Sequence, residues 1–241
     1  MTATFCWTAP PSSSLCCTPS GSLCPGPSYS CNKKKRVPYL SLTLENVEGS
    51  TLKEFPSGSV TRRLILLRHA ESSWNDFSLR DHDRPLSKTG RADAVNVSHQ
   101  LHKLGWIPEM ILCSDARRTR ETLSIMQEQV KSFLQAAVHF IPSFYSVAAM
   151  DGQTAEHLQQ MICKLSRDDI ITVMCMGHNK GWEEAASVFT GAEVELKTCN
   201  AALLEATGKS WEEAFALAGL GGWKLQGIVR PNNAFENCAP T

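Results

Sequence analysis

Four side chains in this sequence could together bind a phosphoryl group and carry it on an imidazole nitrogen: Arg68, His69, Arg118 and His178. Arginine presents a planar fork of N–H donors that fits the oxygens of a phosphate. Histidine can act as a nucleophile or carry a proton near neutral pH. Taken alone, each of these residues could equally well be an ordinary residue at a strand end, in a helix or in a loop. Their chemical meaning therefore depends on whether the fold brings the four together.

Apolar runs of strand length come shortly before these residues, at 64–67, 110–113 and 170–175. Other stretches carry apolar residues at helical spacing, namely 87–104, 115–134, 152–165 and 182–189. An alternation of strands and helices with short connections predicts a three-layer α/β/α sandwich on a mostly parallel sheet. The carboxyl ends of parallel strands share one edge of the sheet, where such folds build their ligand sites. We therefore expect the two arginines and the two histidines to meet at that edge.

The charge balance of the chain gives no reason to expect a nucleic-acid or membrane partner. Its 241 residues include 24 basic and 24 acidic side chains, for a formal net charge of +0 at pH 7. No apolar stretch approaches the roughly 20 residues that a membrane-spanning helix needs. The cysteines beyond residue 31 and the acidic residues show no metal-ligand spacing, so we expect no metal and no other cofactor.

Residues 1–44 differ in composition from the rest of the chain. They are rich in Ser, Thr, Pro and Cys, and they contain four cations and no acidic residue. This composition predicts a disordered transit peptide. The absence of arginine before Arg36 favours a plastid (chloroplast) over a mitochondrion, and a cytoplasmic protein with an untargeted tail stays open as an alternative. We assign residues 45–61 to a linker, 62–235 to the folded domain and 236–241 to a C-terminal tail.

Three motifs give the chain a resemblance to a known family. Residues 68–75, Arg-His-Ala-Glu-Ser-Ser-Trp-Asn, resemble the Arg-His-Gly-Glu-Ser-x-x-Asn motif of the histidine phosphatase superfamily, also called phosphoglycerate-mutase-like. Two further motifs of that family are similar to segments of this chain, namely Ser114-x-x-x-Arg118-x-x-x-Thr122 and Gly177-His178. The resemblance covers residues 62–231, nearly the whole of the expected folded domain.

The resemblance implies a role for each of five residues. His69 would be the catalytic nucleophile, and His178 a second catalytic residue that holds phosphoryl oxygens and, if protonated, adds a positive charge. Arg68 and Arg118 would bind the phosphate, and Asn75 falls on a further position of the phosphate pocket.

The loop at 83–90 and residues 178–184 are similar to the SixA-like branch of phosphohistidine phosphatases. This implies a phosphoglycerate-mutase-like fold and a metal-independent phosphatase that works through a phosphohistidine intermediate on His69. Its substrate would be a phosphohistidine protein or a small phosphorylated molecule, which makes it a phosphoric monoester or phosphoramidate hydrolase. A non-catalytic module with the same fold that binds phosphorylated ligands stays open as an alternative.

The sequence departs from the larger branches of the family at the proton donor to the leaving group. Those branches place a Glu before the third helix, whereas here Asp151 and Glu156 are the nearest acids. The SixA-like branch also lacks a clear donor, which agrees with a phosphoramidate substrate whose leaving nitrogen can itself be protonated.

The charged loop 80–84 could select the substrate or form a solvated cover. A cysteine phosphatase is set aside, because four residues separate Cys113 from Arg118 where that chemistry needs five.

Overall fold

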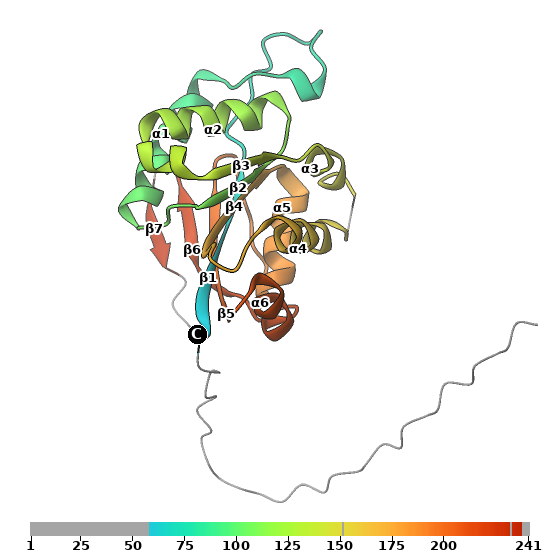
Figure 1. Cartoon of the computed structure of the whole chain (residues 1–241). Helices are drawn as coiled ribbons and strands as arrows, with labels where there is room; N and C mark the ends of the chain where they lie inside the picture. Colours follow the sequence, from blue (N-terminus) through green and yellow to red (C-terminus); the bar gives the residue numbers. More distant parts are fainter. Residues whose placement is uncertain (1–57, 151, 232, 238–241) are drawn as a thin grey trace, which may run out of the picture. The chain divides into compact units, whose positions relative to one another are not determined.

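The computed structural model describes residues 58–150, 152–231 and 233–237 of the chain (Figure 1). These residues form a mixed sheet with the spatial strand order β3-β2-β4-β1-β5-β6-β7. The strands are β1 (Val60–Arg68), β2 (Met110–Cys113), β3 (Ala137–Phe140), β4 (Thr172–Gly177), β5 (Ala201–Gly208), β6 (Lys224–Arg230) and β7 (Asn233–Asn237). The helices are α1 (Lys88–Lys103), α2 (Arg117–Gln129), α3 (Ser143–Val147), α4 (Thr154–Leu165), α5 (Asn179–Thr190) and α6 (Trp211–Ala218), with the short 3-10 helices η1 (Asp81–Asp83) and η2 (Lys131–Gln135).

The first four strands in chain order are parallel to one another. β4 lies between β1 and β2, and β3 pairs with the outer side of β2. β5, β6 and β7 continue the sheet beyond β1 by antiparallel pairing, so β6 points in the same direction as β1. Among the described residues, β1 to β4 and β6 thus share one direction, and the predicted three-layer sandwich on a mostly parallel sheet is confirmed. Every residue of β4 is buried, as expected of a central parallel strand covered on both faces.

Helices cover both faces of the sheet (Figure 1). α1 and α2 pack on one face through a cluster that includes Val97, Leu101 and Met126. α4, α5 and α6 pack on the other face through a cluster that includes Leu158 and Trp182. Alternate residues of β1 and β4 enter the two clusters, as the period-two geometry of a strand requires. None of the helices in the described part of the chain is long and apolar enough to cross a membrane.

The observed elements differ from the predicted ones mainly at their ends. β1 begins at Val60, so residues 60 and 61 of the predicted linker belong to the sheet. β7 ends at Asn237 and includes the first two residues of the predicted tail. α3 has no counterpart among the predicted helices, because five residues are too few to show a helical period. The predicted transit peptide at 1–44, the linker up to residue 57 and residues 238–241 lie outside the described residues.

Candidate active site

The carboxyl ends of β1, β2 and β4 adjoin one another, and three of the segments singled out in the sequence meet there. The backbone N–H of His69 donates to the carbonyl of Gly177 at 3.0 Å. The backbone N–H of Ser114 donates to the carbonyl of Met176, also at 3.0 Å. Both hydrogen bonds continue the parallel pairing one residue beyond the strand ends. His178 follows β4 directly as the N-cap of α5, so the strand ladder itself brings the segments together.

His69 is held as a neutral imidazole in one defined tautomer. Its Nδ1 lies 2.7 Å from the carbonyl oxygen of Ala70, which can only accept, so Nδ1 carries the proton. The lone pair is then on Nε2, which accepts a hydrogen bond from Arg118 Nε at 3.1 Å. Burial, together with the charges of Arg118 and Arg68, lowers the pKa of His69 to about 4. His69 is therefore uncharged at neutral pH, as a nucleophile must be.

His178 has the opposite tautomer. Its Nδ1 accepts a hydrogen bond from Arg118 Nη2 at 3.3 Å, because a guanidinium has only donors to offer. Nε2 therefore carries the proton and donates it to Ser114 Oγ at 2.7 Å. Burial, the neighbouring His69 and Arg118 lower the pKa of His178 to about 2. The additional positive charge expected of a protonated His178 is thus not present in this structure.

Arg118 joins both histidines to the loop that lies over the site. Its side chain is 8% exposed, and each of its three guanidinium nitrogens is engaged. Besides the two histidines, Nη1 donates to the backbone carbonyl of Asp81 at 2.6 Å and Nη2 to the carboxylate Oδ2 of Asp81 at 2.9 Å. The backbone N–H of Ala70 donates to Thr122 Oγ1 at 3.1 Å, which ties α2 to the segment that follows β1. The position of Arg118 is therefore set by α2, which carries it, and by η1, whose Asp81 accepts two of its hydrogen bonds.

Arg68 contributes a second guanidinium at the end of β1. Its Nη1 donates to the carbonyl of Leu196 at 2.7 Å. Its Nε is buried and has no hydrogen-bond partner among the described residues. Burial lowers the pKa of Arg68, and the nearby Glu183 opposes that shift. A buried N–H without a partner is uncommon in proteins, and a phosphoryl oxygen would supply the acceptor.

Three further side chains complete the site: Asp81 and His82 from the charged loop 80–84, and Tyr145, which the sequence did not single out. The Tyr145 hydroxyl donates to Asp81 Oδ2 at 3.0 Å, and the ring of Tyr145 meets that of His178 edge-on at 5.3 Å. His82 contacts Asp115 Oδ1 at 3.2 Å and lies against the ring of Tyr145 at 5.1 Å. Loop 80–84 thus contacts the site directly and is more than a solvated cover. Its charges were visible in the sequence, whereas Tyr145 comes from α3, a helix without a sequence signal.

Asn75 and Glu156 are not among the residues gathered here. Asn75 is exposed, and only its backbone N–H is hydrogen-bonded within the described residues, to Ser73 Oγ at 3.3 Å. Glu156 lies exposed on α4, where it accepts a hydrogen bond from Gln160. Asp151 lies outside the described residues. A phosphate-pocket role for Asn75 stays a prediction.

The fold and this group of residues define a known class of protein. A family model described as histidine phosphatase superfamily (branch 1) matches residues 64–161. An Arabidopsis thaliana protein, named as uncharacterized and chloroplastic, is 70% identical to this chain over 179 residues, which are 74% of this chain and 82% of that protein. The chain belongs to the histidine phosphatase superfamily.

Within the superfamily the chain is SixA-like, as its motifs led us to expect. A protein of Nakamurella multipartitia assigned as phosphohistidine phosphatase SixA is 25% identical, with a TM-score of 0.58 over 72% of this chain and 98% of that chain. An Agrobacterium tumefaciens protein with the same assignment shares the fold at 23% identity, with a TM-score of 0.55 over 70% of this chain and 98% of that chain. The protein histidine phosphatase SixA, solved with tungstate, also shares the fold at 15% identity, with a TM-score of 0.55 over 70% of this chain and 97% of that chain.

The name of the Arabidopsis relative also bears on where the protein resides. Since a protein 70% identical to this chain is named chloroplastic, the plastid localisation expected from the N-terminal composition is confirmed. The exact limits of the transit peptide at residues 1–44 stay a prediction.

Proposed function

We propose that this protein is a phosphatase that takes a phosphoryl group onto Nε2 of His69 and then releases it to water. The observation that carries the proposal is His69 itself, a buried neutral imidazole whose lone pair is on the nitrogen facing Arg118. Arg118 and Arg68 supply the positive charge that phosphoryl transfer requires, so the proposed chemistry needs no metal ion.

In the first step, Nε2 of His69 attacks phosphorus in line with the leaving group. The N–P bond forms while the bond from phosphorus to the leaving atom breaks, and the leaving atom keeps the electron pair. Arg118 Nε, which bonds Nε2 at 3.1 Å, must turn its N–H towards a phosphoryl oxygen as the attack proceeds. The hydrogen bond from Nδ1 to the carbonyl of Ala70 stabilises the positive charge that the imidazole acquires.

In the second step, water attacks the phosphohistidine from the side opposite His69. The N–P bond breaks, its electron pair returns to Nε2, and inorganic phosphate leaves with the oxygen and the two protons of the water. His178 would bind a phosphoryl oxygen in both steps, because a bound dianion raises the pKa of an adjacent imidazole and turns Nδ1 into a donor. Ser114 keeps the ring of His178 in position through its 2.7 Å contact with Nε2.

We propose a phosphohistidine protein, or a small phosphorylated molecule with an equally good leaving group, as the substrate. Asp81 is the acid in contact with the site, and it is a poor proton donor: although burial opposes its charge, Arg118 and Tyr145 hold the pKa of its carboxyl below the ordinary value. A phosphoramidate can take up the proton on its own leaving nitrogen. The SixA assignment of the structural relatives supports the phosphohistidine alternative.

The test is hydrolysis of p-nitrophenyl phosphate and of a phosphohistidine peptide by the full chain, in the presence of a chelator. We expect turnover by the wild type and a loss of about 1,000-fold or more in His69→Ala. We also expect a phosphoryl group on wild-type but not variant protein that survives a base quench and is lost in an acid quench, because a phosphohistidine is labile in acid. The matched control is His99→Ala, since His99 lies exposed on α1. Turnover that survives His69→Ala would rule out the mechanism. Phosphate binding without any turnover would favour the non-catalytic module, and a requirement for added Mg²⁺ would contradict the metal-free chemistry.

A further inference from the structure

The carboxylate of Asp81 accepts a hydrogen bond from an N–H of Arg118 that a bound phosphoryl group would also need. Asp81 Oδ2 accepts hydrogen bonds from Arg118 Nη2 at 2.9 Å and from the Tyr145 hydroxyl at 3.0 Å. Carboxylates and phosphates bind a guanidinium through the same planar fork of N–H groups. Arg118 can therefore turn its full fork to a phosphoryl group only after the carboxylate of Asp81 has moved away.

Arg84 lies beside Asp81 with hydrogen-bond donors left over. Arg84 is 8% exposed, and its Nε and Nη1 are buried without a hydrogen-bond partner among the described residues. Nε lies 3.8 Å from Asp81 Oδ1, beyond hydrogen-bond distance. The guanidinium stacks on Trp74, 3.9 Å from the centroid of the ring, which holds it in place. Buried N–H groups without acceptors cost free energy, so Arg84 favours any acceptor that moves within reach.

We propose that Asp81 exchanges between two arginines: it pairs with Arg118 before phosphate binds, and it pairs with Arg84 once a phosphoryl group has taken its place on Arg118. Asp81 is then a positioning residue that acts through Arg118 and sets the affinity of the site for substrate and for product phosphate. The proposal rests on the proposed function, since it requires that Arg118 bind the phosphoryl group.

The geometry of the loop allows this movement without rearranging the fold. The side chain of Asp81 is 53% exposed, so it can turn without leaving a cavity in the core. The backbone carbonyl of Asp81 has its own hydrogen bond from Arg118 Nη1 at 2.6 Å, which can persist while the carboxylate turns. Asp81 Oδ1 already faces Arg84, and the exchange needs only that the 3.8 Å contact shorten to a hydrogen bond.

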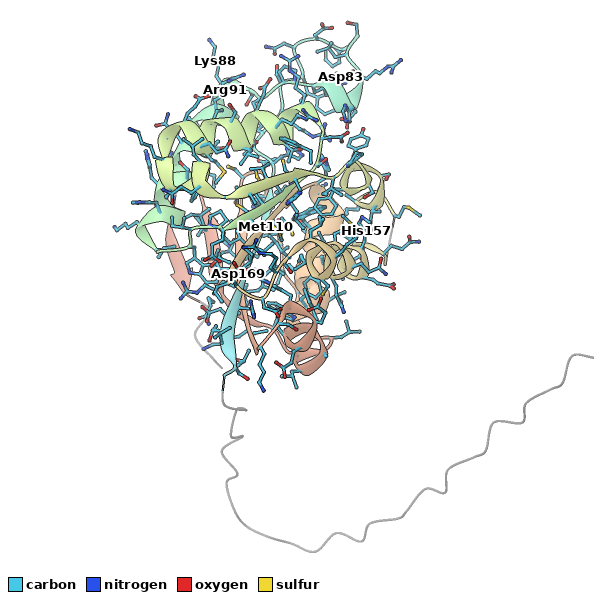
Figure 2. All side chains as sticks on the ribbon, viewed as in Figure 1. Asp83, Lys88, Arg91, Met110, His157 and Asp169 are labelled. Atoms are coloured by element: carbon cyan, nitrogen blue, oxygen red, sulfur yellow. The ribbon has the colours of Figure 1, made fainter. Side chains whose placement is uncertain are left out.

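The first experiment compares Asp81→Asn with Asp83→Asn in the full chain. Asp83 is a matched control, because it lies on η1 at the outside of the same loop, 55% exposed, and contacts His82 rather than an arginine (Figure 2). We expect the Kd of inorganic phosphate, measured by calorimetry, to fall about three- to fivefold in Asp81→Asn, and the KM to fall with it while kcat does not rise. Asp83→Asn should leave both values unchanged. Equal phosphate affinity in the wild type and both variants would overturn the proposal.

The second experiment asks whether Arg84 is the alternative partner, using Arg84→Gln in the wild-type and Asp81→Asn backgrounds. With Asp81 present, losing Arg84 should raise the Kd of phosphate about three- to fivefold, because the displaced carboxylate then has no partner. With Asp81→Asn, the same change should have little effect. A rise in Kd in both backgrounds would overturn the exchange, since Arg84 would then bind phosphate itself. If thermal unfolding shows that Arg84→Gln does not fold, Arg84→Lys, which keeps the charge but loses the planar fork, should give a smaller shift of the same sign.

The two proposals fail in different ways. Wild-type protein that neither binds phosphate nor hydrolyses the phosphohistidine peptide contradicts the proposed function, and the exchange with it. Wild-type protein that does both, and whose phosphate affinity is unaffected by Asp81→Asn, contradicts the exchange alone.

Discussion

Among single residues, Arg118 has the widest influence on the chemistry of the site. Its guanidinium donates to His69 Nε2 and to His178 Nδ1, so each imidazole must turn a lone pair towards it. The other nitrogen of each ring then carries the proton, which goes to the Ala70 carbonyl in one case and to Ser114 in the other. One arginine thus specifies two tautomers, and the same contacts help to keep both rings neutral.

At the residue scale we expect nitrogen-15 NMR of the imidazoles to show opposite tautomers. His69 should be neutral with its proton on Nδ1, and His178 neutral with its proton on Nε2, in phosphate-free buffer at pH 6 to 7. The physical reason is that Arg118 has no lone pair and therefore requires an acceptor nitrogen from each ring. Replacing Ser114 by Ala should disturb the signals of His178 and leave the tautomer of His69 as it is. A midpoint near 6.5 for either ring would contradict the burial argument.

Among the elements, the junction between β4 and α5 decides where His178 lies. The indole of Trp182 on α5 is buried, and its Nε1 donates back to the carbonyl of Cys175 on β4 at 2.9 Å. A Cβ added at Gly177, the last residue of β4, would lie 2.1 Å from the indole. The helix can therefore fold back onto its own strand only because residue 177 has no side chain, and this close packing holds His178 at the sheet edge.

At the element scale we expect Gly177→Ala to destabilise the protein by about 1–3 kcal/mol, through overpacking against Trp182. Urea unfolding measures the change. The colliding atoms belong to the six-membered ring of the indole. Phenylalanine is shorter, so Trp182→Phe should cost less in the Gly177→Ala background than in the wild type. Strictly additive effects of the two substitutions would contradict the contact.

For the whole molecule, burying two neutral histidines makes folding stability depend on pH. Unfolded histidine has a pKa of 6.5, whereas folding lowers that of His69 to about 4 and that of His178 to about 2. Below pH 6.5 the unfolded chain therefore binds protons that the folded chain does not, and stability falls as the pH falls.

We therefore expect the free energy of unfolding to decrease by about 1.4 kcal/mol per pH unit for each of the two histidines as the pH drops from about 6 to about 4. Chemical unfolding at a series of pH values measures this slope. His69→Gln should reduce the slope by the equivalent of one proton, and the exposed His99→Gln should not change it. The same slope in all three proteins would show that His69 is not buried in its neutral form.

Also at the scale of the whole chain, residues Lys53–Thr241 form one compact unit. We expect residues 53–241 to keep the turnover and the unfolding midpoint of the full chain. We also expect residues 1–60, fused to a fluorescent protein, to direct it to plastids. The reason is that the N-terminal composition is typical of a targeting peptide and not of a folded core. Loss of activity in 53–241, or a fusion that stays in the cytosol, would contradict this division of the chain.

Prediction from the sequence worked for residues whose position follows from local pattern. An apolar strand that ends in Arg68 and His69, and another that ends before His178, place those side chains at one sheet edge in any parallel arrangement. Asp81 and Tyr145 follow no such rule. Asp81 meets Arg118 37 positions further along the chain, and Tyr145 meets Asp81 across 64 positions, through a loop and a short helix without periodicity.

The sequence by itself therefore determined the fold class, the family and the edge of the sheet at which Arg68, His69, Arg118 and His178 lie. The fold class and the sheet edge depend on the order of apolar and polar residues along the chain, and the family on the motifs at 68–75, 114–122 and 177–178. Only the tertiary structure decided the tautomers and charge of His69 and His178, and the pairing of Asp81 with Arg118. Those properties depend on burial and on hydrogen-bond partners, which are supplied by residues distant in the sequence. The pair Arg68-His69 led us to expect a phosphate site from the sequence, but only the folded chain shows that the imidazole of His69 is neutral and faces Arg118.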